Sequence, residues 1–154
     1  MSEREKKLAE LGLTLPAVAT PLAAYIPASR SGNLVFVSGQ LPMVDGKLVL
    51  AGKVGADVTV EQAKELAQLC ALNALAAAAD VAGGLDNIVR TVKVVGYVNA
   101  VPDFTAHPQI VNGASELFGA VLGEAGKHSR VAIGVGSLPL GAPVEVELVV
   151  EVLG

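Results

Sequence analysis

The sequence predicts an α+β fold in which two helices pack against one face of a single β-sheet. Two observations favour this class. Runs rich in β-branched residues are separated by longer segments rich in Ala and Leu, and the 154 residues show no change of composition that would mark a second domain. We therefore expect residues 1–154 to form one domain, in which residues 1–20 are an N-terminal extension with a short helix.

The first third of the chain is predicted to hold that short helix and a β-hairpin. Residues 3–11 suit a solvated helix that stops at Gly12. The run "NLVFVSGQLP" at 33–42 has the composition of a strand, and "DGKLVL" at 45–50 opens with an Asp-Gly turn signal before a second short strand. An additional strand is expected near Tyr25.

The rest of the chain alternates helices and strands. Thr59 and Gln62 have the spacing of a capping box, and the Ala-rich segment after them is expected to stay helical to about residue 82, where a Gly-Gly pair follows. The later elements are predicted as a strand at 87–100, a helix at 108–122 and strands at 130–136 and 144–152. The predicted order is ββαβαββ.

The composition predicts an oligomer and excludes several classes of partner. Hydrophobic residues make up 52% of the chain, and the sheet face that the helices leave open needs cover. No apolar run is long enough to span a membrane, and the N-terminus lacks the apolar core of a signal peptide, so we expect a cytoplasmic protein with no membrane partner. A net charge of −4, with two Tyr and three Phe, makes nucleic acid a poor candidate. Cys70 stands alone and is expected to pack inside a helix.

The candidate chemistry lies in residues 128–152, "HSRVAIGVGSLPLGAPVEVELVVEV". Because alternate side chains of a strand share a face, Arg130 lies with three small residues, and Glu145 lies with two other glutamates. Small residues beside an arginine leave a hollow suited to a small carboxylate, and a glutamate in the same hollow can orient a water or move a proton. In the alternative interpretation, Arg130 pairs with a nearby acid and the glutamates face solvent.

Three segments resemble the signature segments of the RidA/YjgF/UK114 family: "NLVFVSGQLP", "VNGASELF" and "SRVAIGVGSLPLGAPVEVELVVEV". Their order and separation fit that family from about Tyr25 to Val152, and the N-terminal extension is similar to a longer-chain branch of it. The resemblance implies a chorismate mutase-like α+β fold with a mixed sheet. It also implies a homotrimer with a barrel-like core and clefts between the subunits.

The resemblance further implies an activity and a set of site residues. The best-characterised members hydrolyse reactive 2-imino acids, or their enamine tautomers, to 2-oxo acids and ammonia without a metal or a cofactor. Arg130 matches the arginine that binds the carboxylate of the substrate, and Glu145 matches the acid that activates or orients the attacking water. The remaining cleft positions match Tyr25, Ser38, Gly39 and Asn112. A small carboxylate-bearing metabolite is therefore the expected ligand.

Two departures from the family pattern keep other functions open. Many imine deaminases of the family carry a cysteine where this chain has Ala132, and "FTAHPQIVN" is longer than the matching stretch of the short-chain members. The first alternative is a protein that binds a 2-oxo acid without turning it over, for sensing or for regulation. The second is endoribonuclease activity, which has been attached to relatives and which the charge and the few aromatic residues disfavour.

The two histidines, His107 and His128, lie in no recognisable hydrolase motif and predict no metal site. We expect His107 to mark the entry of the second helix. His128, two residues before Arg130, is the one that can reach the rim of a cleft.

Overall fold

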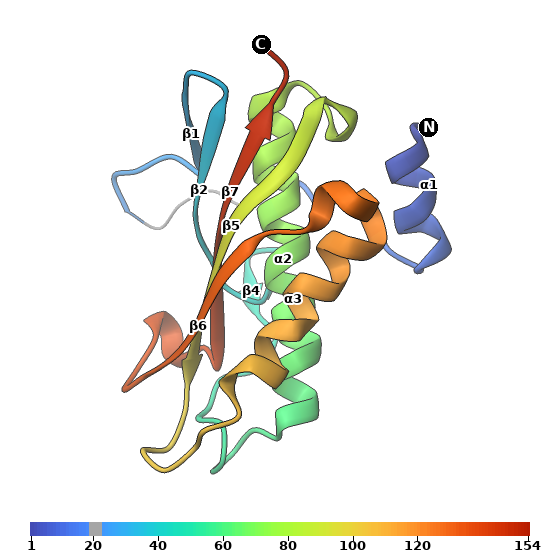
Figure 1. Ribbon diagram of the computed structural model, residues 1–154. Coiled ribbons are helices and arrows are strands. Elements are labelled where there is room, and N and C mark those ends of the chain that lie inside the picture. The colour runs from blue at the N-terminus through green and yellow to red at the C-terminus, as the bar shows by residue number, and fades with distance from the viewer. Residues whose placement is uncertain (19–22) are drawn as a thin grey trace.

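The computed structural model describes residues 1–18 and 23–154, and it confirms the α+β class with a mixed sheet. Two long helices lie against one face of the main sheet, and α1 packs at the edge of this helical layer (Figure 1). The elements are α1 (Glu3–Glu10), β1 (Ala28–Ser31), β2 (Leu34–Gln40), β3 (Met43–Val44), β4 (Lys47–Leu48), α2 (Val60–Ala82), β5 (Ile88–Asn99), α3 (His107–Leu122), β6 (Ser129–Val135) and β7 (Val144–Val152). Short 3₁₀ turns, η1 (Leu85–Asn87), η2 (Gly123–Gly126) and η3 (Pro139–Gly141), connect them.

The described strands of the main sheet follow the order β1-β2-β7-β5-β6. The pair β5 and β6 is parallel, as expected for strands joined through a helix, and the other neighbours are antiparallel. The last strand along the chain, β7, therefore lies in the middle of the sheet. The additional strand expected near Tyr25 is present, but it begins at Ala28.

The predicted hairpin needs a correction. Asp45 and Gly46 do form its turn, both with positive φ, but the turn joins β3 to β4 in a small sheet of their own. The predicted strand at 33–42 becomes β2, which pairs with β1 and, across more than a hundred residues, with β7. A turn signal specifies the local pairing only, whereas the partner of β2 is chosen by burial of its alternate side chains against the helices.

The long helix begins and ends as predicted. Thr59 accepts a hydrogen bond from the backbone of Gln62, whose side chain accepts one from the backbone of Thr59, and Gly83 closes the helix in a left-handed conformation. By length and composition α2 could cross a membrane, yet 67% of its most apolar window is buried inside the fold. That degree of burial is what a core helix shows. Cys70 is fully buried in α2, as expected, and burial raises the pKa of its thiol.

Helices α2 and α3 approach each other closely at Gly113. A Cβ atom built on Gly113 would lie 3.0 Å from the carbonyl carbon of Lys64 in α2, and nearer still to its oxygen. Only glycine fits between the two backbones here. The shared core beneath the helices includes the fully buried ring of Phe118.

The two faces of the sheet differ in character. Val144, Val146, Leu148 and Val150 of β7 are buried under the helices, and the residues between them point to the opposite face. No helix of the described chain covers that opposite face (Figure 1). It exposes large apolar side chains on β2 and β6, with Phe36 46% and Ile133 41% exposed. We refer to it as the open face.

Candidate functional site

Arg130 stands near the start of β6, an edge strand, and points to the helical side of the sheet. Its Nη1 donates hydrogen bonds to Asn112 Oδ1 at 2.8 Å and to Ser115 Oγ at 3.1 Å, both on α3. Both acceptors are neutral, and no carboxylate of residues 1–18 or 23–154 forms an ion pair with Arg130. The alternative in which Arg130 pairs with an acid is therefore not what the described chain adopts. Its charge stays available to a ligand.

Ser115 and His128 join this group, although neither was predicted as a site residue. Ser115 Oγ lies 2.8 Å from His128 Nε2, and His128 Nδ1 lies 2.6 Å from the carbonyl oxygen of Gly126. The signal available in the sequence was the two-residue spacing of His128 and Arg130, which was enough to suggest proximity. The contact with Ser115, thirteen residues earlier, depends on how α3 packs on β6.

Glu145 lies in a second group, on the open face. A Cβ atom on Gly39 would be 2.9 Å from Cδ of Glu145, so the absence of a side chain at Gly39 leaves space for this carboxyl. Gly39 lies next to an irregularity in the pairing of β2 with β7. Ser38 Oγ donates to the carbonyl oxygen of Ile26 at 2.7 Å, and this ties the segment that carries Tyr25 to β2. Tyr25 is 52% exposed.

The charge state of Glu145 is perturbed by its surroundings. Partial burial raises the pKa of its carboxyl, and the nearby charge of Glu147 raises it further. Glu147 in turn accepts a hydrogen bond from the hydroxyl of Tyr97, which raises the pKa of that phenol to about 12. A carboxyl that holds its proton more tightly than usual is better matched to proton transfer near neutral pH.

Within one chain the two predicted catalytic residues do not meet. Arg130 is in register with Val94, which is buried under the helices, whereas Glu145 is in register with Tyr97 on the open face. One chain alone therefore does not form the hollow in which a glutamate lies beside Arg130, and a cleft that both residues share between subunits stays a prediction. Residue alternation assigns side chains to faces within a strand, but it does not say which face of one strand matches which face of another.

The hollow expected beside Arg130 is also partly filled. Beyond Ala132, the imidazole of His107 lies against Gly134, 2.5 Å from where a Cβ would stand. A pocket of about 540 Å³ opens beside that ring, and its lining residues include Phe104, His107, Gly134 and Gly136. Lys53 also lines this pocket and donates to Asn99 Oδ1 at 2.7 Å and to the carbonyl oxygen of Gly136 at 2.6 Å. As expected, His107 is the first residue of α3.

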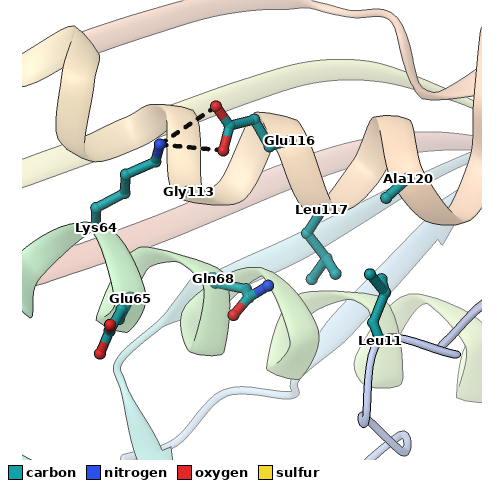
Figure 2. A pocket seen from close by; sticks show the side chains of 8 residues that line it. All are labelled: Leu11, Lys64, Glu65, Gln68, Gly113, Glu116, Leu117 and Ala120. Atoms are coloured by element: carbon teal, nitrogen blue, oxygen red, sulfur yellow. Dashed lines mark hydrogen bonds and ion pairs between the residues drawn. The ribbon is translucent and has the colours of Figure 1, made fainter. Parts of the chain in front are cut away.

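Another hollow, of about 250 Å³, lies between α2, α3 and the residue that follows α1 (Figure 2). Its lysine, Lys64, is paired with Glu116 at 3.2 Å, so the charge is already neutralised. Gly113, Leu117 and Ala120 line the wall that α3 contributes. This hollow lacks a free cation for a carboxylate. In the described residues, no three His, Cys, Asp or Glu side chains gather as a metal site would require.

Comparison with known proteins places the chain among relatives of nearly equal length. It is 42% identical over 145 residues to Protein TCP17 of Trypanosoma cruzi, an overlap that covers 94% of this chain and 91% of the relative. The crystal structure of Atu1372 from Agrobacterium tumefaciens, described as of unknown function, superposes with a TM-score of 0.91 at 47% identity, covering 97% of this chain and 92% of that one.

A more distant structure, TdcF of E. coli with bound serine, shares the fold with a TM-score of 0.60 at 22% identity, over 90% of this chain and 93% of that one. The family model that matches residues 5–152 is described as "YjgF/chorismate mutase-like, putative endoribonuclease". The expected chorismate mutase-like fold is thereby confirmed. The chain belongs to the YjgF/chorismate mutase-like family.

Proposed function

We propose that the protein hydrolyses small 2-imino acids, or their enamine tautomers, to 2-oxo acids and ammonia without a cofactor. The proposal depends on the hydrogen bonding of Arg130: its guanidinium donates to two neutral acceptors through Nη1. Nε and Nη2 form the other edge of the group. That edge matches a carboxylate through two parallel hydrogen bonds.

The reaction requires little more than a held carboxylate and a placed water. The substrate carboxylate binds Arg130, and Glu145 takes a proton from the water as its oxygen adds to C2 of the C=N bond. Glu145 returns this proton to the nitrogen, which gives a tetrahedral adduct with one hydroxyl and one amino group. The hydroxyl proton then passes to the amino group through Glu145, the C–N bond breaks, and ammonia leaves as the carbonyl forms. One water is consumed, and one 2-oxo acid and one ammonia are produced. The raised pKa of Glu145 supports this role.

We place the reaction in a cleft between two copies of the chain, arranged as a homotrimer. Arg130 with Asn112 and Glu145 with Gly39 lie on opposite faces of one sheet, so a complete site needs a group from each of two chains. Such a head-to-tail contact is heterologous, and three copies can close it into a ring. The exposed side chains of Phe36, Val131 and Ile133 on the open face supply apolar area for that contact.

A second function, small-carboxylate binding without turnover, is favoured by one specific residue. Ala132 stands on the strand next to Arg130, where a cysteine is found in many imine deaminases of the resembling family, so this chain has no thiol there. The serine bound in TdcF is a small carboxylate ligand, which supports a ligand of the same class for this chain under either function.

The test combines turnover with binding. An amino-acid oxidase generates the imine in situ, semicarbazide traps it, and the protein should lower the yield of semicarbazone by consuming the imine first. Arg130→Ala should reduce this effect about a hundredfold, because hydrogen bonds to charged groups contribute about 1.5–3 kcal/mol. Glu145→Gln should also lose turnover while it retains binding of pyruvate.

Matched variants separate the site from general effects of charge. Arg90 and Glu151 form an ion pair on neighbouring strands and are both partly exposed, so Arg90→Ala and Glu151→Gln should leave turnover unchanged.

Pyruvate binding without turnover of any imine would instead establish the binding function. Cleavage of RNA by nuclease-cleared protein would favour the endoribonuclease alternative. Light scattering should give three times the chain mass of 15.6 kDa.

A further inference from the structure

We infer that His128 is a positioning residue for the carboxylate site and that it acts on Arg130 through the hydroxyl of Ser115. The inference rests on the proposed function, since it concerns the same guanidinium. It goes beyond that function because it assigns a role to two residues, Ser115 and His128, that neither bind substrate nor carry out the chemical step.

The hydrogen bonds of His128 fix its tautomer. Nδ1 lies 2.6 Å from the carbonyl oxygen of Gly126, and a carbonyl oxygen only accepts, so Nδ1 must carry the ring proton. In the neutral ring Nε2 is then an acceptor, 2.8 Å from Ser115 Oγ. The hydroxyl of Ser115 therefore donates its one proton to His128.

This direction of donation determines what Ser115 offers to Arg130. A hydroxyl that rotates freely alternates between donating and accepting, but with its proton committed to His128 it presents only lone pairs to the guanidinium. Nη1 of Arg130 donates to it at 3.1 Å, and also to Asn112 Oδ1 at 2.8 Å. Two fixed acceptors on one nitrogen restrict rotation of the guanidinium plane. The unused edge then faces one direction before a ligand arrives, which lowers the cost of binding.

The imidazole is itself held in place by the core. Its ring meets the buried ring of Phe118 edge to face, with centroids 5.8 Å apart and an interplanar angle of 89°. Phe118 lies one helical turn after Ser115 on α3, so both of these contacts come from the same side of the helix. The contact with Phe118 sets the plane of the imidazole, and the hydrogen bond between Nδ1 and Gly126 sets which edge of the ring faces Ser115.

The experiment measures pyruvate binding to the full-length protein by calorimetry and imine turnover in parallel. His128→Leu and Ser115→Ala should each raise Kd and KM about tenfold, which corresponds to about 1.4 kcal/mol. The value of kcat should stay within about twofold, because a grip on the carboxylate stabilises ground state and transition state alike. The double variant should be no weaker than either single one, since both break the same chain of hydrogen bonds.

Two variants control for nonspecific effects. His128→Gln should bind pyruvate within about twofold of the parent protein, because its amide oxygen can replace Nε2 as the acceptor. Ser129→Ala removes a neighbouring hydroxyl that donates to the carbonyl oxygen of Val92 and should also leave Kd unchanged.

The outcomes separate the inference from the proposed function. If Arg130→Ala abolishes pyruvate binding while His128→Leu binds like the parent, the positioning role alone is wrong. If Arg130→Ala binds pyruvate as the parent protein does, both the positioning role of His128 and the proposed function are wrong. A measurement on the unaltered protein guards against variants that misfold: a long-range ¹H–¹⁵N spectrum should show His128 protonated at Nδ1. Protonation at Nε2 in the neutral ring would overturn the inference.

Discussion

Substitution of Gly113 by alanine tests the helix packing that places Asn112 and Ser115 over β6. The added Cβ would stand 3.0 Å from the carbonyl carbon of Lys64 and closer to its oxygen, within a distance that real Cβ atoms essentially never show. The obstacle is the backbone of α2, which cannot rotate away as a flexible side chain would. Gly113→Ala therefore requires α2 and α3 to move apart.

Two effects of opposite sign determine how much stability Gly113→Ala loses. Alanine is favoured over glycine inside a helix by about 0.5–1 kcal/mol. Overpacking of a well-packed core costs about 1–3 kcal/mol, and a backbone obstacle places this site toward the upper end. The net loss of stability is about 1–2 kcal/mol. In a chain of this size each kcal/mol changes Tm by roughly 2–4 °C, so Tm should fall by roughly 2–8 °C.

Gly119 provides the matched control on the same helix. Apart from its chain neighbours and the nearby backbone of its own helix, no heavy atom of the described residues lies within 4 Å of the position that its Cβ would occupy, and its φ is not positive. Gly119→Ala therefore gains helix propensity without a clash and should raise the free energy of unfolding by about 0.5–1 kcal/mol. Thermal unfolding followed by circular dichroism compares the two variants. A Gly113→Ala protein as stable as the Gly119→Ala protein would refute the packing argument.

Three further predictions follow from the open face. Glu147→Gln should lower the pKa of Tyr97 from about 12 toward its ordinary value of 10, because the hydrogen bond to the Glu147 carboxylate is the largest cause of the raised pKa. Phenolate absorbance measured in a Tyr25→Phe background reports the pKa of Tyr97 alone. An unchanged titration would contradict the hydrogen bond as the cause. The same variant should lower the pKa of Glu145 by removing a neighbouring negative charge, which the acidic limb of the pH–rate profile would report as a shift to lower pH. Glu145→Gln should stabilise the fold at neutral pH, because a carboxyl whose pKa is raised in the folded state loses its stabilising contribution as pH rises through the folded pKa. The gain in Tm should disappear at a pH below the pKa of an unfolded glutamate. An equal gain in Tm at this low pH and at neutral pH would argue against burial as the cause of the raised pKa.

The elements of the fold could be predicted from local patterns, because each one carries its own signal. The capping box at Thr59 and the left-handed Gly83 define the long helix, and β-branched runs define the central strands. The hairpin was predicted with the wrong partner for β2, since strand pairing across more than a hundred residues depends on burial and not on a nearby turn.

The candidate site could be predicted only as a set of residues. The match to family segments named Arg130 and Glu145, but their placement on opposite faces follows from sheet order and register, which single strands do not encode. Ser115 was missed, and so was its hydrogen bond with His128, because this contact depends on the packing of α3 against β6. The filling of the hollow by His107 was missed for the same reason.

The central position of β7 has a consequence for synthesis of the protein. Until residues 144–152 have left the ribosome, β2 and β5 have no common neighbour and the apolar undersides of α2 and α3 have no complete sheet to cover. The nascent chain must therefore keep these surfaces exposed until β7 emerges. A premature stop codon before residue 144 would leave two unconnected half-sheets, a species that chaperones or proteases would be expected to capture.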